Sequence, residues 1–151
     1  MNIILKYVNK NAATAAALRD YDNMRRIIDN TPDDIKDLYE QMTVVRSSKL
    51  SKTPKSKYPH GYINKLEAQI DELGVMRDRY GQAVEYLQWL EPAWEALTIA
   101  ERHILTEFYL SGSQRSGANS RLKAEMNYSK SQVERKRSGA LYHLRILLFG
   151  C

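Results

Sequence analysis

The stretch that decides the fold runs from Leu97 to Gly150. It reads 97-LTIAERHILTEFYL-110, then a polar segment over 111–117, then 118-ANSRLKAEMNYSKSQVERKRSGALYHLRILLFG-150. Apolar residues recur in it at steps of three and four, which is typical of one face of an α-helix. The pattern predicts three helices, the last two joined by a short turn at Asn127 and Tyr128. Asparagine tolerates a left-handed backbone, so it can end one helix just before the next begins.

Two helix starts carry the pattern of a capping box. Thr98 is followed three residues later by Glu101, and Ser129 is followed three residues later by Gln132. In this arrangement a hydroxyl and a carboxylate or amide satisfy unpaired N–H groups at the beginning of a helix. We therefore expect helices to begin directly after Thr98 and Ser129.

The last predicted helix has one apolar and one polar face. The apolar stripe consists of Val133, Ala140, Leu141, Leu144 and Leu148. The opposite face carries Lys130, Ser131, Glu134, Arg135 and Ser138. A recognition helix enters the DNA major groove with such a face, its N-terminal residues toward the base edges. The solvated face of a small helical domain would look the same, so the pattern alone leaves both interpretations open.

The run N-Y-S-K-S-Q-V-E-R-K-R-S-G-A-L-Y-H-L-R, residues 127–145, resembles the recognition helix of region 4 of bacterial sigma factors. The upstream L-T-x-x-E-R-x-I-L matches the same family. With its L-L-F-G ending and helical N-terminal half, the chain is similar to phage late-gene transcription regulators of the ArpU and RinA type. The match covers the last third closely and the rest loosely. It departs at Lys136, where sigma factors carry an aliphatic residue, and at Glu134, where a basic residue is usual.

The resemblance implies a sequence-specific DNA-binding regulator of phage or prophage transcription, an activator that acts like sigma region 4. Double-stranded DNA and host RNA polymerase are the implied partners. By analogy, the side chains that reach base edges are Lys130, Ser131, Gln132, Glu134 and Arg135. The candidates for phosphate contacts, which position the protein but carry no sequence information, are Arg121, Lys123, Lys136 and Arg137.

Two other functions fit the same pattern. A small-terminase-like DNA-packaging adaptor also joins a helix-turn-helix to helical oligomerisation segments, and a ring-sized oligomer in light scattering would indicate it. A protein-only adaptor would use the fold to bind RNA polymerase or a regulator. Binding of polymerase without any duplex would indicate this second alternative.

The positive charge of the chain is concentrated in its C-terminal part. The whole sequence has 23 basic and 18 acidic residues, a net charge of +5. Residues 97–151 hold nine basic and four acidic residues, so they account for the entire excess, and residues 1–96 hold 14 of each. A basic segment beside a neutral one indicates a polyanionic partner.

The N-terminal region is predicted to be helical as well. We expect one helix over 2–28 and a boundary at 30–34, where Thr31 would cap a second helix with Pro32 at its first position. That second helix is predicted to run to about Arg46. The basic, proline-containing stretch over 46–60 is either an arm that touches phosphate or a solvated connector, and its length favours the connector.

Residues 61–91 form the longest helical pattern, close to a heptad seam. Its apolar positions are Ile63, Leu66, Ile70, Leu73, Met76, Tyr80, Val84, Leu87 and Leu90. This seam packs either on residues 2–46, which need a partner for their own apolar stripes, or on a second copy in a homo-oligomer. Pro92 is predicted to end or kink the helix.

The sequence therefore predicts an all-α protein with a helical N-terminal region over 1–92 and a three-helix DNA-binding domain over 93–151. It contains no phosphate-binding loop and no nucleophile motif, and its three histidines lack metal-ligand spacing. Cys151 is the only cysteine. We therefore expect neither enzyme activity nor a cofactor. The sequence shows neither a signal peptide nor an apolar run of membrane-spanning length, so the expected compartment is the cytoplasm of a bacterium or of a phage-infected bacterium.

Overall fold

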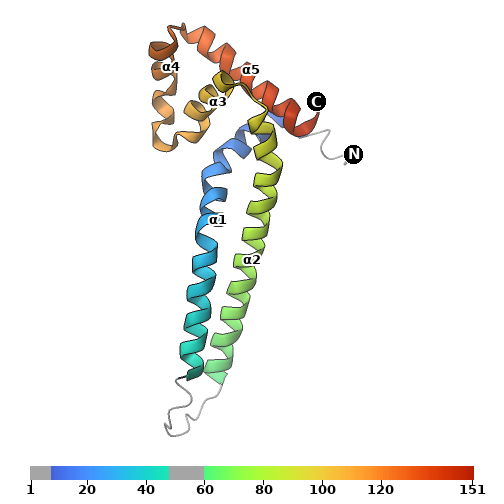
Figure 1. Ribbon diagram of the computed structural model, residues 1–151, viewed down its shortest axis with the longest axis vertical. Coiled ribbons are helices and arrows are strands. Elements are labelled where there is room, and N and C mark those ends of the chain that lie inside the picture. The colour runs from blue at the N-terminus through green and yellow to red at the C-terminus, as the bar shows by residue number, and fades with distance from the viewer. Residues whose placement is uncertain (1–7, 48–59) are drawn as a thin grey trace. The chain divides into compact units, whose positions relative to one another are not determined.

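The computed structural model describes residues 8–47 and 60–151, and all regular structure in these ranges is helical (Figure 1). The α-helices are α1 (Lys10–Ser47), α2 (His60–Glu95), α3 (Ile99–Leu105), α4 (Ala118–Met126) and α5 (Lys130–Phe149). Between α3 and α4 lie a π-helical turn, η2 (Thr106–Leu110), and a 3₁₀ turn, η3 (Gly112–Gly117). The all-α class is thus confirmed. Of the basic connector predicted over 46–60, residues 48–59 lie outside the described residues, whereas 46–47 end α1 and His60 begins α2.

Helix α1 is continuous across the boundary predicted at 30–34, so that prediction is wrong. The helix contains Pro32, and Thr31 lies inside it with 7% of its surface exposed instead of capping a new helix. A proline inside a helix costs about 3 kcal/mol. Burial of apolar residues on the same face before and after the proline outweighs that cost. The helix begins near Asn9, whose Oδ1 accepts a hydrogen bond from the Ala12 N–H (3.1 Å).

Helix α2 also passes through its proline. The helix does not end at Pro92, because α2 continues to Glu95. The carbonyl of Pro92 accepts a hydrogen bond from the N–H of Ala96 (3.2 Å). Leu90, Ala93 and Leu97 are all buried around this point, so packing holds the last turn in helical form.

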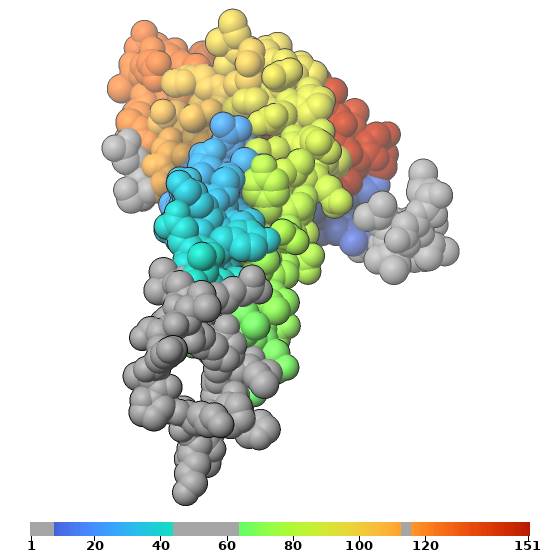
Figure 2. All heavy atoms as spheres, turned by 60° about the horizontal axis from the view of Figure 1, so that its bottom comes forward, coloured from blue at the N-terminus to red at the C-terminus, as the bar shows by residue number. Residues whose placement is uncertain are grey.

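The described chain divides into two compact units, the first made of residues up to Asn23 together with Tyr86–Cys151, the second of Met24–Glu85. The core of the first unit consists of Ala15, Leu18, Ala93, Leu97, Leu105, Tyr109, Ala140 and Leu144. The end of α5 lies beside the end of α2, where the Phe149 and Trp89 ring centroids are 5.7 Å apart (Figure 2). The sequence-based division at residue 92 differs from this grouping, which places the first turns of α1 with the C-terminal helices.

The second unit consists of one segment of α1 and one of α2, which run side by side in opposite directions (Figure 1). An Arg77 Nη2 N–H donates to the Tyr39 hydroxyl across them (2.9 Å). The buried and half-buried positions alternate at steps of three and four: Met24, Ile28, Thr31, Ile35, Leu38 and Met42 on α1, and Leu66, Gln69, Leu73, Met76, Tyr80 and Ala83 on α2.

The buried face of α2 is rotated slightly from the predicted seam. Ile70 was expected inside but is 52% exposed, and its neighbour Gln69 is buried instead. Consecutive residues of a helix point about 100° apart. A seam that is assigned by choosing the more apolar of two neighbouring residues can therefore be rotated away from the face that is buried. No helix among the described residues is long and apolar enough to cross a membrane.

Candidate nucleic-acid interface

The start of α3 is a capping box, as predicted. Thr98 Oγ1 accepts a hydrogen bond from the Glu101 N–H (3.2 Å), and Glu101 Oε2 accepts one from the Thr98 N–H (2.9 Å). The other carboxylate oxygen, Oε1, lies 2.9 Å from Nδ1 of His143 on α5. One side chain therefore caps α3 and also ties it to α5.

The environment of Glu101 favours its charged form. Burial acts to raise the pKa of this carboxyl group, but hydrogen bonds from the Thr98 backbone, the His143 ring and the Thr98 hydroxyl outweigh it. The net result is a pKa below the ordinary value of 4.5.

The turn between α4 and α5 also has the predicted form. Asn127 adopts a left-handed backbone conformation with φ 54° and ψ 34°. Two residues later, Ser129 Oγ accepts from the Gln132 N–H (3.3 Å), and Gln132 Oε1 accepts from the Ser129 N–H (2.8 Å). The chain thus reverses within three residues, and α5 begins with its first N–H groups satisfied.

A small apolar cluster holds α3, α4 and α5 together. Its buried members are Ile104, Leu122 and Val133, one from each helix. Because Val133 points into this cluster, the opposite side of the first turns of α5 faces outward. Of the sequence-predicted base-reading residues, Lys130, Ser131, Gln132 and Arg135 are exposed, whereas Glu134 is half-buried.

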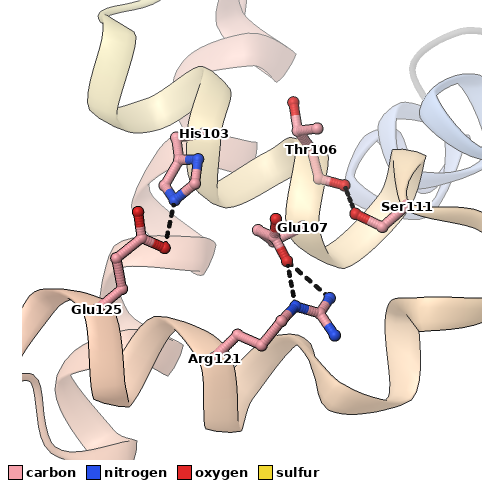
Figure 3. A network of polar contacts seen from close by, with 6 residues as sticks. All are labelled: His103, Thr106, Glu107, Ser111, Arg121 and Glu125. Carbon is pink, nitrogen blue, oxygen red and sulfur yellow. Dashed lines mark hydrogen bonds and ion pairs between the residues drawn. The ribbon is translucent and has the colours of Figure 1, made fainter.

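A histidine–carboxylate contact and an arginine–carboxylate ion pair join α3 and the following turn to α4 (Figure 3). His103 Nε2 lies 3.1 Å from Glu125 Oε2, and the Arg121 Nε N–H donates to Glu107 Oε2 (2.7 Å). Arg121, predicted to contact phosphate, is therefore held by a carboxylate of its own chain. The Ser111 hydroxyl donates to the carbonyl of Thr106 (2.9 Å), which fastens the end of the π-helical turn.

Two further predicted site residues on α5 are engaged inside the protein. Glu134 Oε1 accepts a hydrogen bond from Asn119 Nδ2 on α4 (3.1 Å), and its Oε2 lies 3.4 Å from Arg137 Nη2. The Arg137 guanidinium also lies over the Phe108 ring, 4.8 Å from the centroid. Sequence reasoning missed Asn119, because no local pattern on α4 marks a residue that bonds to a helix 15 positions away.

The remaining predicted residues on α4 and α5 are exposed. These are Lys123, Lys130, Ser131, Gln132, Arg135 and Lys136. The side chains of the four cations among them make no hydrogen bond or ion pair with any residue that the structure describes. Gln132 is used by the cap, and Ser131 Oγ lies 3.1 Å from Ser129 Oγ. The four cations are therefore exposed and have no partner among the described residues, so each is available to an external anion.

Among the described residues, no group of three or more histidine, cysteine or carboxylate side chains could hold a metal ion. Comparison of the chain with protein-family models, curated proteins and solved structures found no match.

Proposed function

We propose that this protein is a sequence-specific DNA-binding transcription regulator in which α4 and α5 form a helix-turn-helix and α5 is the recognition helix. The observation that carries the proposal is the outward face of the first turns of α5, with its unpaired cations and small polar side chains. Such a face, supported from behind by two other helices, matches the geometry by which a recognition helix enters the major groove.

Within this surface we assign two kinds of contact. Arg135, about one turn inside the helix, is suited to donate two hydrogen bonds to guanine O6 and N7. Lys130, Ser131 and Gln132 precede it at the N-terminal end of α5, where base edges are closest. Lys123 on α4 and Lys136 supply charge for phosphates, which fixes the position of the helix without reading sequence.

Three residues of the sequence-based set receive a different role. Arg121, Arg137 and Glu134 are bound to side chains of their own chain. We therefore propose that they support the α3–α4–α5 arrangement, and that the DNA contacts come mainly from the exposed residues.

The resemblance of 97–105 and 127–145 to sigma region 4 supports a role in phage or prophage transcription, as an activator that contacts host RNA polymerase in the cytoplasm. The antiparallel pair formed by α1 and α2 in the second unit resembles a short coiled coil. We propose it as the interaction region, for polymerase or for a second copy. No catalytic step is part of this function.

The test is duplex binding by the full chain, measured by fluorescence anisotropy over a range of salt concentrations, after selection of a preferred sequence from a random library. Arg135→Ala should reduce the preference for the selected duplex over a random one by about 5- to 150-fold, the equivalent of about 1–3 kcal/mol. Lys136→Ala should weaken binding to both alike and reduce the salt slope by about 0.9.

A matched control is Lys65→Ala, which removes the same charge from an exposed position on α2. It should leave both affinities unchanged. If the parent protein binds no duplex, the DNA-binding proposal fails. If Arg135→Ala leaves the selected-to-random ratio unchanged, α5 does not read sequence through this residue.

A further inference from the structure

A cleft of about 430 Å³ lies between α3 and the first half of α5. Among its lining residues, Ile104 and Ala140 are almost fully buried (4% and 1% exposed), whereas Thr98 and Ala100 are exposed and line the cleft from the α3 side. Arg135, Lys136 and Gly139 line it from α5. A volume of about 300–1,000 Å³ with mostly apolar walls and a few polar groups is typical of small-molecule sites.

The charges around the cleft favour an anion. Arg135 and Lys136 have no ion-pair or hydrogen-bond partner among the residues that the structure describes. Glu101 is the one carboxylate among the lining residues, and both of its oxygens are already engaged, by Thr98 and by His143. The lining residues therefore carry two cations and one carboxylate, an excess of one positive charge, and the carboxylate is directed to Thr98 and His143.

Gly139 helps to keep the cleft open. A Cβ at this position would meet no atom within 4 Å, so crowding does not require glycine here. The φ angle of Gly139 is not positive, so the backbone conformation does not require glycine either. Glycine inside a helix costs about 1 kcal/mol relative to alanine. The absent side chain leaves room beside Arg135, one helical turn earlier, for a ligand to approach the helix backbone.

We propose that this cleft binds a small organic anion, one acidic group on an apolar body, and that the bound anion regulates α5. The acidic group would pair with Arg135 and Lys136 while the apolar body covers Ala100 and Gly139, the exposed apolar residues of the lining. A bare inorganic ion would leave this apolar surface in water, whereas a purely apolar ligand would leave the cations unpaired. The regulatory half rests on the proposed function, because Arg135 cannot pair with the ligand and with a guanine at the same time.

The binding half is tested without DNA. The probe is 1-anilinonaphthalene-8-sulfonate, an aromatic body with one sulfonate, and the control is N-phenyl-1-naphthylamine, the same body without the charge. Fluorescence titration of the full chain should show saturable binding of one sulfonate dye per chain, at least about tenfold tighter than the neutral dye, as expected for one charge-assisted hydrogen bond. Equal affinity for the two dyes, or no saturable binding, would overturn the proposal.

Variants locate the site. Gly139→Leu should abolish sulfonate binding by filling the cleft, and Arg135→Ala should weaken it about tenfold. Gly74→Leu is the matched control, because a Cβ at Gly74 also meets nothing within 4 Å but lies on α2 of the second unit. Circular dichroism should show that all three variants are folded. If Gly139→Leu binds the dye like the parent, or if 10 mM phosphate displaces the dye fully, the cleft is not a site for an organic anion.

The regulatory half has its own readout. Saturating sulfonate dye should weaken binding of a red-fluorophore-labelled duplex at least about fivefold in the parent and not at all in Gly139→Leu. If the dye binds the cleft but duplex affinity is unchanged, the regulation is wrong and the site stands. If the dye binds and the parent binds no duplex, the DNA function fails and the site again stands.

Discussion

Glu134 lies on the polar face of α5, and its partners lie on its own chain. The resemblance to sigma region 4 predicts a base contact for Glu134, which falls on the same side of the predicted helix as Lys130 and Arg135. The structure gives it an amide donor from Asn119 and a guanidinium from Arg137. Side-chain periodicity predicts which face of the helix a residue occupies. Whether its side chain remains available to an external ligand depends on the side chains of the neighbouring helix. The exposed cations were therefore predictable, and the engaged residues were not.

Replacing Glu134 separates its two interactions. The amide oxygen of Glu134→Gln can still accept from Asn119, and only the exposed ion pair with Arg137 is lost, which is worth about 0–1 kcal/mol. Glu134→Ala loses both, so it should lower the free energy of unfolding by a further ~1 kcal/mol. Urea unfolding followed by tryptophan fluorescence measures both. Neither variant should change the DNA sequence selected from a random library; a change confined to one base pair would show that Glu134 reads a base.

At the scale of the elements, helix type was predictable and two boundaries were not. The caps at Thr98 and Ser129 and the left-handed Asn127 could be read locally, because a cap is made by residues three positions apart. The sequence around Pro32 carries equally good local signals for a helix start. There, burial of Ile28, Thr31 and Leu38 along one face outweighs the proline, and this packing depends on α2, far along the chain.

Pro32→Ala tests whether packing carries α1 through its proline. The substitution restores an N–H for the carbonyl of Ile28 and removes the steric conflict with it. We expect it to raise the free energy of unfolding, by up to about 3 kcal/mol, in thermal and urea melts followed by circular dichroism. Asp33→Ala, at the exposed neighbouring position, should change it by less than about 0.5 kcal/mol. A melt of Pro32→Ala at or below that of the parent would contradict this account.

The cap of α3 makes a prediction about pH. The pKa of Glu101 is lower in the folded protein than its ordinary value of 4.5. The stabilisation is therefore fully present above the unfolded pKa and is lost as the pH falls through the folded pKa. Glu101→Gln should reduce the loss of stability between about pH 5 and pH 3. Urea midpoints at half-unit pH intervals would show this, with Glu95→Gln as the exposed control at the end of α2. Parallel curves for the parent and Glu101→Gln would contradict it.

At the scale of the whole molecule, the sequence does not predict which segments pack into the same compact unit. The excess positive charge lies entirely in residues 97–151, which favours a division close to residue 92. The core of the first unit nevertheless includes Ala15 and Leu18 from α1 together with Leu105 and Leu144. The Tyr86 hydroxyl donates to the carbonyl of Ala17, and burial raises the pKa of Tyr86. Contacts between residues so far apart in sequence leave no local pattern.

Two leucines on α1 test this grouping. Leu18 is fully buried in the first unit and Leu38 is 5% exposed in the second. Either leucine-to-alanine substitution should cost about 2–5 kcal/mol. Both tryptophans, Trp89 and Trp94, lie in the first unit, so their fluorescence reports on that unit, whereas circular dichroism reports on all helices.

Leu18→Ala should therefore lower the urea midpoint followed by tryptophan fluorescence. Leu38→Ala should lower the midpoint followed by circular dichroism more than the fluorescence midpoint, because the helices of the second unit can lose structure while the tryptophans remain packed. If Leu18→Ala leaves the fluorescence midpoint unchanged, the first turns of α1 do not belong to the core that supports α5. If both variants shift both signals equally, the two units unfold as one cooperative body.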